Sequence, residues 1–144
     1  MRVLVQRCKK ASCLVDRKTI SSINEGLVLF VGFTDTDTFD TITKMVTKII
    51  NLRIFPDSDG VMNLSIHDLN LSILSISQFT LYADTKKGNR PSYLKALKSD
   101  KAKELYDFFN QELKKHLKTE TGVFGADMEI ELINMGPTTI LLER

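Results

Sequence analysis

The sequence has few of the residues on which several protein classes depend. Its 144 residues include only two cysteines, Cys8 and Cys13, and two histidines, His67 and His116. Two cysteines cannot build a disulfide scaffold, and their spacing matches no redox or zinc signature, so we expect both to be buried as small apolar side chains. The histidines lie far apart in the chain and belong to no ligand motif. We therefore predict neither a metal site nor a cofactor.

Long apolar runs and common catalytic motifs are also missing. No apolar run approaches the roughly 20 residues of a membrane-spanning helix. The longest early run, Leu27–Phe33, is too short and too late for a signal peptide. We therefore expect a cytoplasmic protein without a membrane partner. The absence of a Gly-x-Ser-x-Gly elbow, a phosphate-binding loop and a dinucleotide fingerprint excludes three common enzyme patterns.

The residues that are present fit one ordinary globular domain over residues 1–144. Hydrophobic residues make up 42% and charged residues 26% of the chain, and the net charge is +2. Apolar spacing predicts strands at Arg2–Cys8, Ala11–Val15 (after an interruption at Lys9-Lys10), Thr19–Ile23, Leu27–Phe33, Leu52–Phe55, Leu71–Ala83, Met128–Leu132 and Thr138–Leu142.

Two helices are expected between these strands. The first begins near Thr34–Asp37, which offers several capping side chains, and the second begins near Ser99 or Asp100. A strand, a helix and a strand between Leu27 and Phe55 predict a βαβ unit. The fold class is therefore α/β, a single mixed sheet with the two helices packed on one side.

Polar residues interrupt the apolar stretch Leu71–Ala83. Ser75, Ser77, Gln78 and Thr80 lie within six positions of this expected buried strand. A buried polar group without a hydrogen-bond partner costs about 1–3 kcal/mol. The pattern therefore predicts either a strand whose end opens into a site, or hydroxyls bonded to neighbouring backbone with Gln78 in solvent. The residues alone leave both interpretations open.

A Gly-Pro pair and a basic segment are two further features that could belong to a binding site. Gly136-Pro137 interrupts the last strand, and proline inside a strand pattern belongs at an edge or a turn. A glycine before it leaves backbone groups uncovered, so the pair is either a recognition device or a simple edge turn. Lysines and one arginine dominate residues 86–103, where only Asp100 opposes them. Such a segment either contacts phosphates or is a solvated surface.

Together these residues resemble the D-aminoacyl-tRNA deacylase family over nearly the whole chain. The motifs that carry the resemblance are Met1–Arg7, Asn51–Phe55 with Met62-Asn63, Ser77–Ala83, Lys87–Pro91, Phe124–Met128 and Asn134–Thr139. Ser-Gln-x-Thr followed at this distance by Gly-Pro is the specific pair, whereas neither motif suffices alone.

The resemblance implies a homodimer with its sites at the subunit interface. Gly136 and Pro137, joined by a cis bond, would form a chiral filter in the partner's pocket, where an L side chain collides with their carbonyls. Arg7 would hold the Gly-Pro loop. The expected lining of the pocket for the terminal adenosine and the ester is Ser77, Gln78 and Phe79, with Phe124 and Met128 beside it. Glycyl-tRNA mischarged on tRNA(Ala) would pass the filter because glycine has no side chain.

The implied reaction is hydrolysis of the ester that joins a D-amino acid to tRNA. A backbone amide near Phe79 is the candidate oxyanion donor. Thr80 is a nucleophile by residue type, but no base is visible to activate it, so we expect it to be dispensable. The resemblance also makes Lys86, Lys87 and Arg90 candidate contacts for the acceptor stem, with tRNA and not DNA as the partner.

Other functions stay open at this point. A non-enzymatic nucleic-acid-binding homodimer would use the basic segment but leave the polar strand unexplained. An esterase for a small ester with Thr80 as nucleophile lacks a base. A deacylase that clears L-amino acids would differ from the Ser-Gln-Phe-Thr pattern. The chain also departs from the family at Thr138, where valine is usual. Threonine keeps the shape of valine and adds a hydroxyl, so we expect the geometry of the filter to survive.

Overall fold

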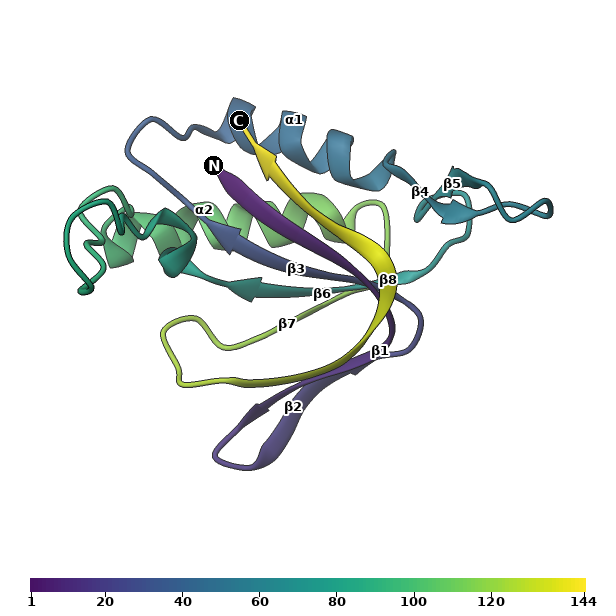
Figure 1. Cartoon of the computed structure of the whole chain (residues 1–144), viewed down its shortest axis with the longest axis horizontal. Coiled ribbons are helices and arrows are strands. Elements are labelled where there is room, and N and C mark those ends of the chain that lie inside the picture. The colour runs from purple at the N-terminus through teal and green to yellow at the C-terminus, as the bar shows by residue number, and fades with distance from the viewer.

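The computed structural model describes residues 1–144, and its main sheet is built around β1 (Arg2–Val15). β2 (Lys18–Ile23) and β3 (Gly26–Gly32) follow one another along one edge of β1. β8 (Glu129–Glu143) lies along the other edge, and all three strands run antiparallel to β1. The long β1 is therefore hydrogen-bonded on both edges, which leaves β8 as an edge strand (Figure 1).

Parallel strands complete the sheet on the far side of β3. β6 (Ser72–Ser77) runs parallel to β3, and β7 (Thr119–Thr121) runs parallel to β6. The crossover from β3 to β6 contains α1 (Phe39–Ile50), and the crossover from β6 to β7 contains α2 (Ser99–Lys114). Both helices lie on the same side of the sheet (Figure 1), which confirms the predicted mixed sheet with two helices on one side.

Two hydrophobic cores lie on opposite faces of this sheet. The larger one contains 22 buried residues and joins the helices to the sheet, for example Leu29 of β3, Ile49 of α1 and Phe109 of α2. The smaller one contains 7 buried residues, including Cys8, Cys13 and Leu74. Both cysteines are fully buried and unpaired, as expected. No helix in the structure is long and apolar enough to cross a membrane.

The sheet is strongly curved around the smaller core. The Ser21 hydroxyl of β2 donates a hydrogen bond to the backbone oxygen of Thr121 in β7, at 2.9 Å. β2 and β7 stand at the two ends of the strand order, so this bond brings the ends of the sheet together. The curvature gives the Cys8 side of the sheet a core of its own although no helix covers it.

The predicted βαβ unit is wrong in its last strand. β4 (Arg53–Pro56) follows α1 as expected, but it pairs with β5 (Met62–Ser65) in a separate two-stranded sheet. The Asp57 carboxylate accepts hydrogen bonds from the backbone N–H groups of Asp59 and Val61, both at 3.0 Å, and closes the turn between them. This local turn favours an antiparallel hairpin, so the parallel partner of β3 is β6 instead.

Other boundaries also differ from the predictions. β1 continues through Lys9 and Lys10, which are exposed, and the irregularity appears only as a shift in register against β8. β8 likewise continues through the expected break at Asn134–Pro137. The stretch Leu71–Ala83 is wrong as a single strand, because β6 ends at Ser77 and the 3₁₀ helix η1 (Phe79–Tyr82) follows.

The helix caps were also predicted at the wrong residues. The N-cap of α1 is Thr38, which forms a capping box with Thr41, and not a residue of Thr34–Asp37. The N-cap of α2 is Lys98, without a side-chain hydrogen bond, and neither Ser99 nor Asp100 fills that position. Asp37 does not cap α1 because its carboxylate is used elsewhere.

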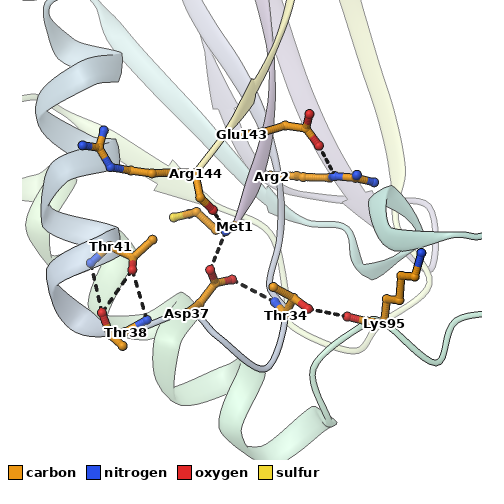
Figure 2. A network of polar contacts seen from close by, with 9 residues as sticks. All are labelled: Met1, Arg2, Thr34, Asp37, Thr38, Thr41, Lys95, Glu143 and Arg144. Atoms are coloured by element: carbon orange, nitrogen blue, oxygen red, sulfur yellow. Dashed lines mark hydrogen bonds and ion pairs between the residues drawn. The ribbon is translucent and has the colours of Figure 1, made fainter.

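The Asp37 carboxylate lies in a buried polar network near both ends of the chain (Figure 2). One oxygen bonds the N-terminal ammonium group of Met1, which also donates to the backbone oxygen of Arg144 at 2.6 Å. The other oxygen accepts the backbone N–H of Thr34 at 2.8 Å, and the Thr34 hydroxyl donates to the backbone oxygen of Lys95 at 2.7 Å. The network thus joins β1, the loop before α1 and the segment before α2.

This network predicts a large effect of Asp37→Ala on stability. The substitution leaves the buried ammonium of Met1 without its counter-charge, and removing one partner of a buried ion pair costs about 3–5 kcal/mol. Asp40→Ala is the matched control, because the Asp40–Lys44 pair is exposed and is expected to contribute less than about 1 kcal/mol. The measurement is urea unfolding of both variants; equal losses in the two would contradict the assignment.

Candidate active site

A cavity of about 510 Å³ lies where the parallel strands β3 and β6 end. Val31 of β3 pairs with Ser77 of β6 in the last pair of the ladder, and both residues line the cavity. The start of α2 and the loop between β7 and β8 provide the other walls. Carboxyl ends of parallel strands are a common position for ligand sites in α/β proteins, and a volume of this size suits a small ligand.

η1 forms the lip of the cavity and begins directly after β6. The Gln78 backbone N–H donates to Val31 O at 2.7 Å, so the chain leaves β6 while still bonded to β3. Gly32 allows this turn, since a Cβ atom there would lie 2.9 Å from the backbone oxygen of Gln78 and 3.3 Å from side-chain atoms of Leu81 and Tyr82. The sequence interpretation did not identify Gly32, which stands inside an apolar strand and carries no other signal.

Three of the four predicted Ser-Gln-Phe-Thr residues line the cavity, and the fourth bonds one of them. Ser77, Gln78 and Phe79 line the cavity, and the Phe79 side chain is 58% exposed. Thr80 does not line it; its hydroxyl accepts a hydrogen bond from the Gln78 side-chain amide. The backbone N–H groups of Phe79 and Thr80 precede the first bond within η1, Leu81 N–H to Gln78 O, so they are available to a ligand.

Arg2 contacts two residues of η1. Its guanidinium donates to the backbone oxygen of Leu81 at 2.8 Å and lies 4.8 Å from the ring centre of Tyr82. Burial raises the pKa of Tyr82 to about 12, so the phenol stays neutral beneath the site. Arg2 was not singled out from sequence as a site residue, although it lies within a family motif.

The loop from Phe124 to Met128 covers the opposite wall of the cavity. Phe124 and Met128, both predicted from the resemblance, line it, together with Gly125, Ala126 and Asp127. Asp127 is the only ionisable side chain among the lining residues. Only the two apolar ends of this loop, Phe124 and Met128, are predicted from the resemblance to line the pocket.

Arg7, Gly136 and Pro137 lie together but not in the cavity. Between the pairs Cys8–Asn134 and Gln6–Thr139, β8 carries four residues where β1 carries only Arg7, so Gly136 and Pro137 bulge from the edge strand. Arg7 donates to Gly136 O at 3.4 Å and to Ile54 O at 2.6 Å. The Gly136–Pro137 bond is cis, both residues are exposed, and nothing lies within 4 Å of where a Gly136 Cβ would be.

The residue behind this bulge is well packed. Thr138 is buried, and its hydroxyl contacts the sulfur of Met62 at 3.8 Å. The hydroxyl that distinguishes it from valine thus has a weak partner in β5.

The two groups of predicted residues are separated along β3. Arg7 lies opposite Leu27 at the start of β3, whereas Val31 at its end lines the cavity. Four residues of strand correspond to about 13 Å at roughly 3.3 Å per residue. Within one chain, the structure therefore brings Ser77, Gln78 and Phe79 together with Phe124 and Met128, but not with Gly136 and Pro137.

The basic loop lies next to η1. Lys86, Lys87 and Arg90 are all exposed, and their loop is closed by a short antiparallel bridge between Asp84 and Ser92. The Asp84 carboxylate caps the start of the loop through the Lys86 backbone N–H at 3.0 Å. Hydrogen bonds from that N–H and from Lys95 hold the pKa of Asp84 below its usual value, so the carboxylate stays charged.

Side chains that serve as nucleophiles or metal ligands elsewhere do not gather here. Burial raises the pKa of the Cys8 thiol to about 11 and raises that of Cys13 as well, which makes both poor nucleophiles at neutral pH. His67 and His116 are exposed and do not line the cavity. No group of three or more His, Cys, Asp or Glu side chains is placed to hold a metal ion.

Comparisons with known proteins found one matching family and two similar structures. Residues 4–143 match the family model described as D-Tyr-tRNA(Tyr) deacylase. A solved structure described as "c-Myc DNA Unwinding Element Binding Protein" superposes with a TM-score of 0.95 at 37% identity, covering 100% of this chain and 99% of that one. A probable eukaryotic D-amino acid tRNA deacylase superposes with a TM-score of 0.85 at 18% identity, covering 98% and 97%, and shows the same fold.

Proposed function

We propose how this chain selects its substrate. The chain belongs to the D-Tyr-tRNA(Tyr) deacylase family and hydrolyses the ester bond of D-aminoacyl-tRNA. The cavity at the ends of β3 and β6 holds the terminal adenosine and its ester, while Gly136 and Pro137 of a second copy reject L-amino acids. The observation that carries the proposal is the separation of the cavity from Gly136 and Pro137 in one chain, with Gly136, Pro137 and Phe79 at the lip of the cavity all exposed.

The cavity suits an aminoacylated adenosine. Ten of its sixteen lining residues are hydrophobic, which favours a flat base and an apolar side chain. Ser77 and Gln78 place polar groups in its lining, where they can fix the ribose and the ester. The exposed ring of Phe79 at the lip offers a stacking surface for the adenine.

The Gly136-Pro137 bulge supplies the stereochemical filter. Arg7 holds the Gly136 carbonyl and is itself anchored to β4 through Ile54 O, so the bulge is held from behind. Bare backbone carbonyls accept hydrogen bonds from the substrate's α-amino group and leave no room for a side chain of L configuration. A D side chain points away from them.

This arrangement requires a homodimer. The bulge cannot reach the cavity of its own chain, which lies about 13 Å further along the sheet. A second copy that packs against β8 delivers its bulge instead. Support for that contact comes from the exposed apolar side chains of β8, Ile133 and Leu141, which lie on either side of the bulge.

The chemistry needs no side-chain nucleophile. A water molecule attacks the ester carbonyl, the bond from the carbonyl carbon to the ribose oxygen breaks, and that oxygen takes the proton. The Phe79 backbone N–H faces the developing oxyanion, and such a donor is worth about 3–4 kcal/mol. The ribose 2′-hydroxyl, which is part of the substrate, assists the proton transfer. The products are the free D-amino acid and tRNA.

Glycine also passes the proposed filter. The filter rejects by collision with an L side chain, and a glycyl ester has only hydrogen at both positions. We therefore include glycyl-tRNA mischarged on tRNA(Ala) among the substrates.

The basic loop binds the acceptor end of the tRNA. Lys86, Lys87 and Arg90 are exposed beside η1, close to where the rest of the tRNA must leave the cavity. Contacts of this kind bind phosphates without reading sequence. The relative at 37% identity is described as a DNA-binding protein, so a binding function without catalysis is the second candidate. The cavity, with Ser77 and Gln78 in its lining, and the bulge favour the deacylase.

Parallel hydrolysis of D-tyrosyl-tRNA and L-tyrosyl-tRNA tests the proposed filter. Without added metal, the D-ester is hydrolysed and the L-ester is not. Gly136→Ala lowers hydrolysis of the D-ester at least about 10-fold, since an added methyl group enters the partner's cavity, while thermal unfolding is unchanged because nothing in the chain surrounds that position. Hydrolysis of both esters by the wild type would remove the filter, and tRNA binding without hydrolysis would favour the second candidate.

Thr80→Ala tests the role of the hydroxyl. Because Thr80 lies outside the cavity lining and has no base beside it, hydrolysis of D-tyrosyl-tRNA falls by less than about 10-fold, the size of a lost supporting hydrogen bond. Single-turnover rates are the appropriate measurement. Loss of all activity, in a variant that keeps its fold and its oligomeric state, would instead make Thr80 the nucleophile.

Charge reversal in the basic loop tests tRNA binding. Lys87→Glu combined with Arg90→Glu weakens tRNA binding about 10-fold or more at low salt and reduces its dependence on salt, because two phosphate contacts are lost. Lys48→Glu with Lys115→Glu, two exposed lysines outside both the cavity lining and the basic loop, is the matched control for net charge. Equal affinity of the two double variants would place the tRNA elsewhere.

A further inference from the structure

A second exposed aromatic ring stands beside the lip of the cavity. Tyr93 follows directly after the bridge that closes the basic loop, and its ring packs edge-on against Phe79, with the centroids 5.1 Å apart and the planes at 68°. The Tyr93 residue is 41% exposed. The other two tyrosines, Tyr82 and Tyr106, are buried. An exposed ring that contacts a cavity residue but does not itself line the cavity has no role in the proposed reaction.

The segment that carries Tyr93 is held in place by backbone hydrogen bonds on both sides of this residue. Before it, Ser92 exchanges two hydrogen bonds with Asp84, at 2.8 and 2.9 Å. After it, the backbone oxygen of Lys95 accepts the Thr34 hydroxyl at 2.7 Å (Figure 2), and Leu97 N–H donates to Phe33 O at 2.9 Å. A surface aromatic on a segment fixed at both ends is preorganised for binding, because little conformational freedom remains to be lost.

We propose that Tyr93 is a stacking platform for the unpaired nucleobase that precedes the terminal adenosine of the tRNA. The inference rests on the proposed function. If the terminal adenosine and its ester occupy the cavity, the preceding nucleotide must leave over the lip that Phe79 forms. Tyr93 is the aromatic ring that this nucleotide meets next, and aromatic rings stack on bases of any identity.

The charges around the platform suit a single-stranded RNA end. Lys86, Lys87 and Arg90 lie in the loop that ends just before Tyr93, and Lys95 lies two residues beyond Tyr93. Of these, only Lys95 is paired with a carboxylate, Asp84 at 3.2 Å. A flat aromatic surface with free cations beside it matches the pattern by which proteins bind single strands without reading sequence.

Steady-state kinetics with two substrates test the platform. D-tyrosyl-tRNA carries the preceding nucleotide, and the minimal ester 3′-O-(D-tyrosyl)adenosine does not. For Tyr93→Ala, KM for the tRNA rises about 5-fold or more, as expected for one lost base stack, while kcat/KM for the minimal ester stays within about 2-fold. Tyr93→Phe keeps the ring and restores the wild-type KM. Leu94→Ala is the matched control, because Leu94 is 92% exposed and neighbours the ring.

A direct binding measurement complements the kinetics. The chain has no tryptophan, so Tyr93→Trp introduces a single fluorescent reporter at the platform. The trinucleotide CCA quenches its emission, whereas adenosine 5′-monophosphate alone, which fits the cavity but lacks the preceding base, leaves the emission unchanged.

The outcomes separate this inference from the proposed function. Hydrolysis of neither ester by the wild type would overturn both. Hydrolysis of both esters, with Tyr93→Ala either harmless or equally damaging to the two, would overturn the platform alone. Equal quenching by CCA and by the mononucleotide would place the ring on the terminal adenosine instead. Dissociation of Tyr93→Ala from dimer to monomer in sedimentation would make the ring a contact between copies, which also overturns the platform.

Discussion

The parallel ladder between β3 and β6 is the constraint on which the rest of the site depends. Its last pair, Val31 with Ser77, leaves two strand ends side by side, and the bond from Gln78 N–H to Val31 O carries the chain one residue further before it turns. Ser77 is the last residue of β6 and Gln78 is the first beyond it, and both line the cavity. Ser75 differs from them, because it is fully buried within β6 and its hydroxyl has no hydrogen-bond partner.

A single missing side chain allows this turn. Any residue larger than glycine at position 32 would place its Cβ 2.9 Å from the backbone oxygen of Gln78, and η1 would have to move away from β3. Arg2 contacts η1 as well, through the Leu81 backbone oxygen and the Tyr82 ring, so the segment that carries Phe79 is held both by β3 and by Arg2. The lip of the cavity is therefore rigid although it consists of one short 3₁₀ helix.

The Gly136-Pro137 bulge depends on the position of β8 at the edge of the sheet. β8 has no neighbour beyond β1, so it can hold four residues opposite one without breaking a ladder on its far side. Arg7 fills the space behind that bulge and bonds both Gly136 and Ile54. The edge position of β8 permits the bulge and also leaves apolar residues of β8 exposed. The proposed filter and the proposed contact with a second copy therefore both depend on β8 being an edge strand.

Local sequence patterns determined several features of this protein without help from the tertiary structure. Apolar spacing determined the mixed α/β class, the two helices on one side and the burial of Cys8 and Cys13, because those depend on which side chains leave water. The resemblance to the deacylase family predicted the residues that meet in the cavity. In each case the controlling interaction lies within a few residues of the chain.

Only the tertiary structure decided how these pieces are connected. Whether β3 pairs with β4 or β6 depends on the hairpin that Asp57 closes, and where β6 ends depends on the space beside Gly32, 45 positions earlier. The Thr34–Asp37 caps were expected on α1, but the buried ammonium of Met1 takes Asp37. Competition between distant partners for one group has no local signature, and this is why strand partners, helix caps and the separation of Gly136 from the cavity emerge only from the folded chain.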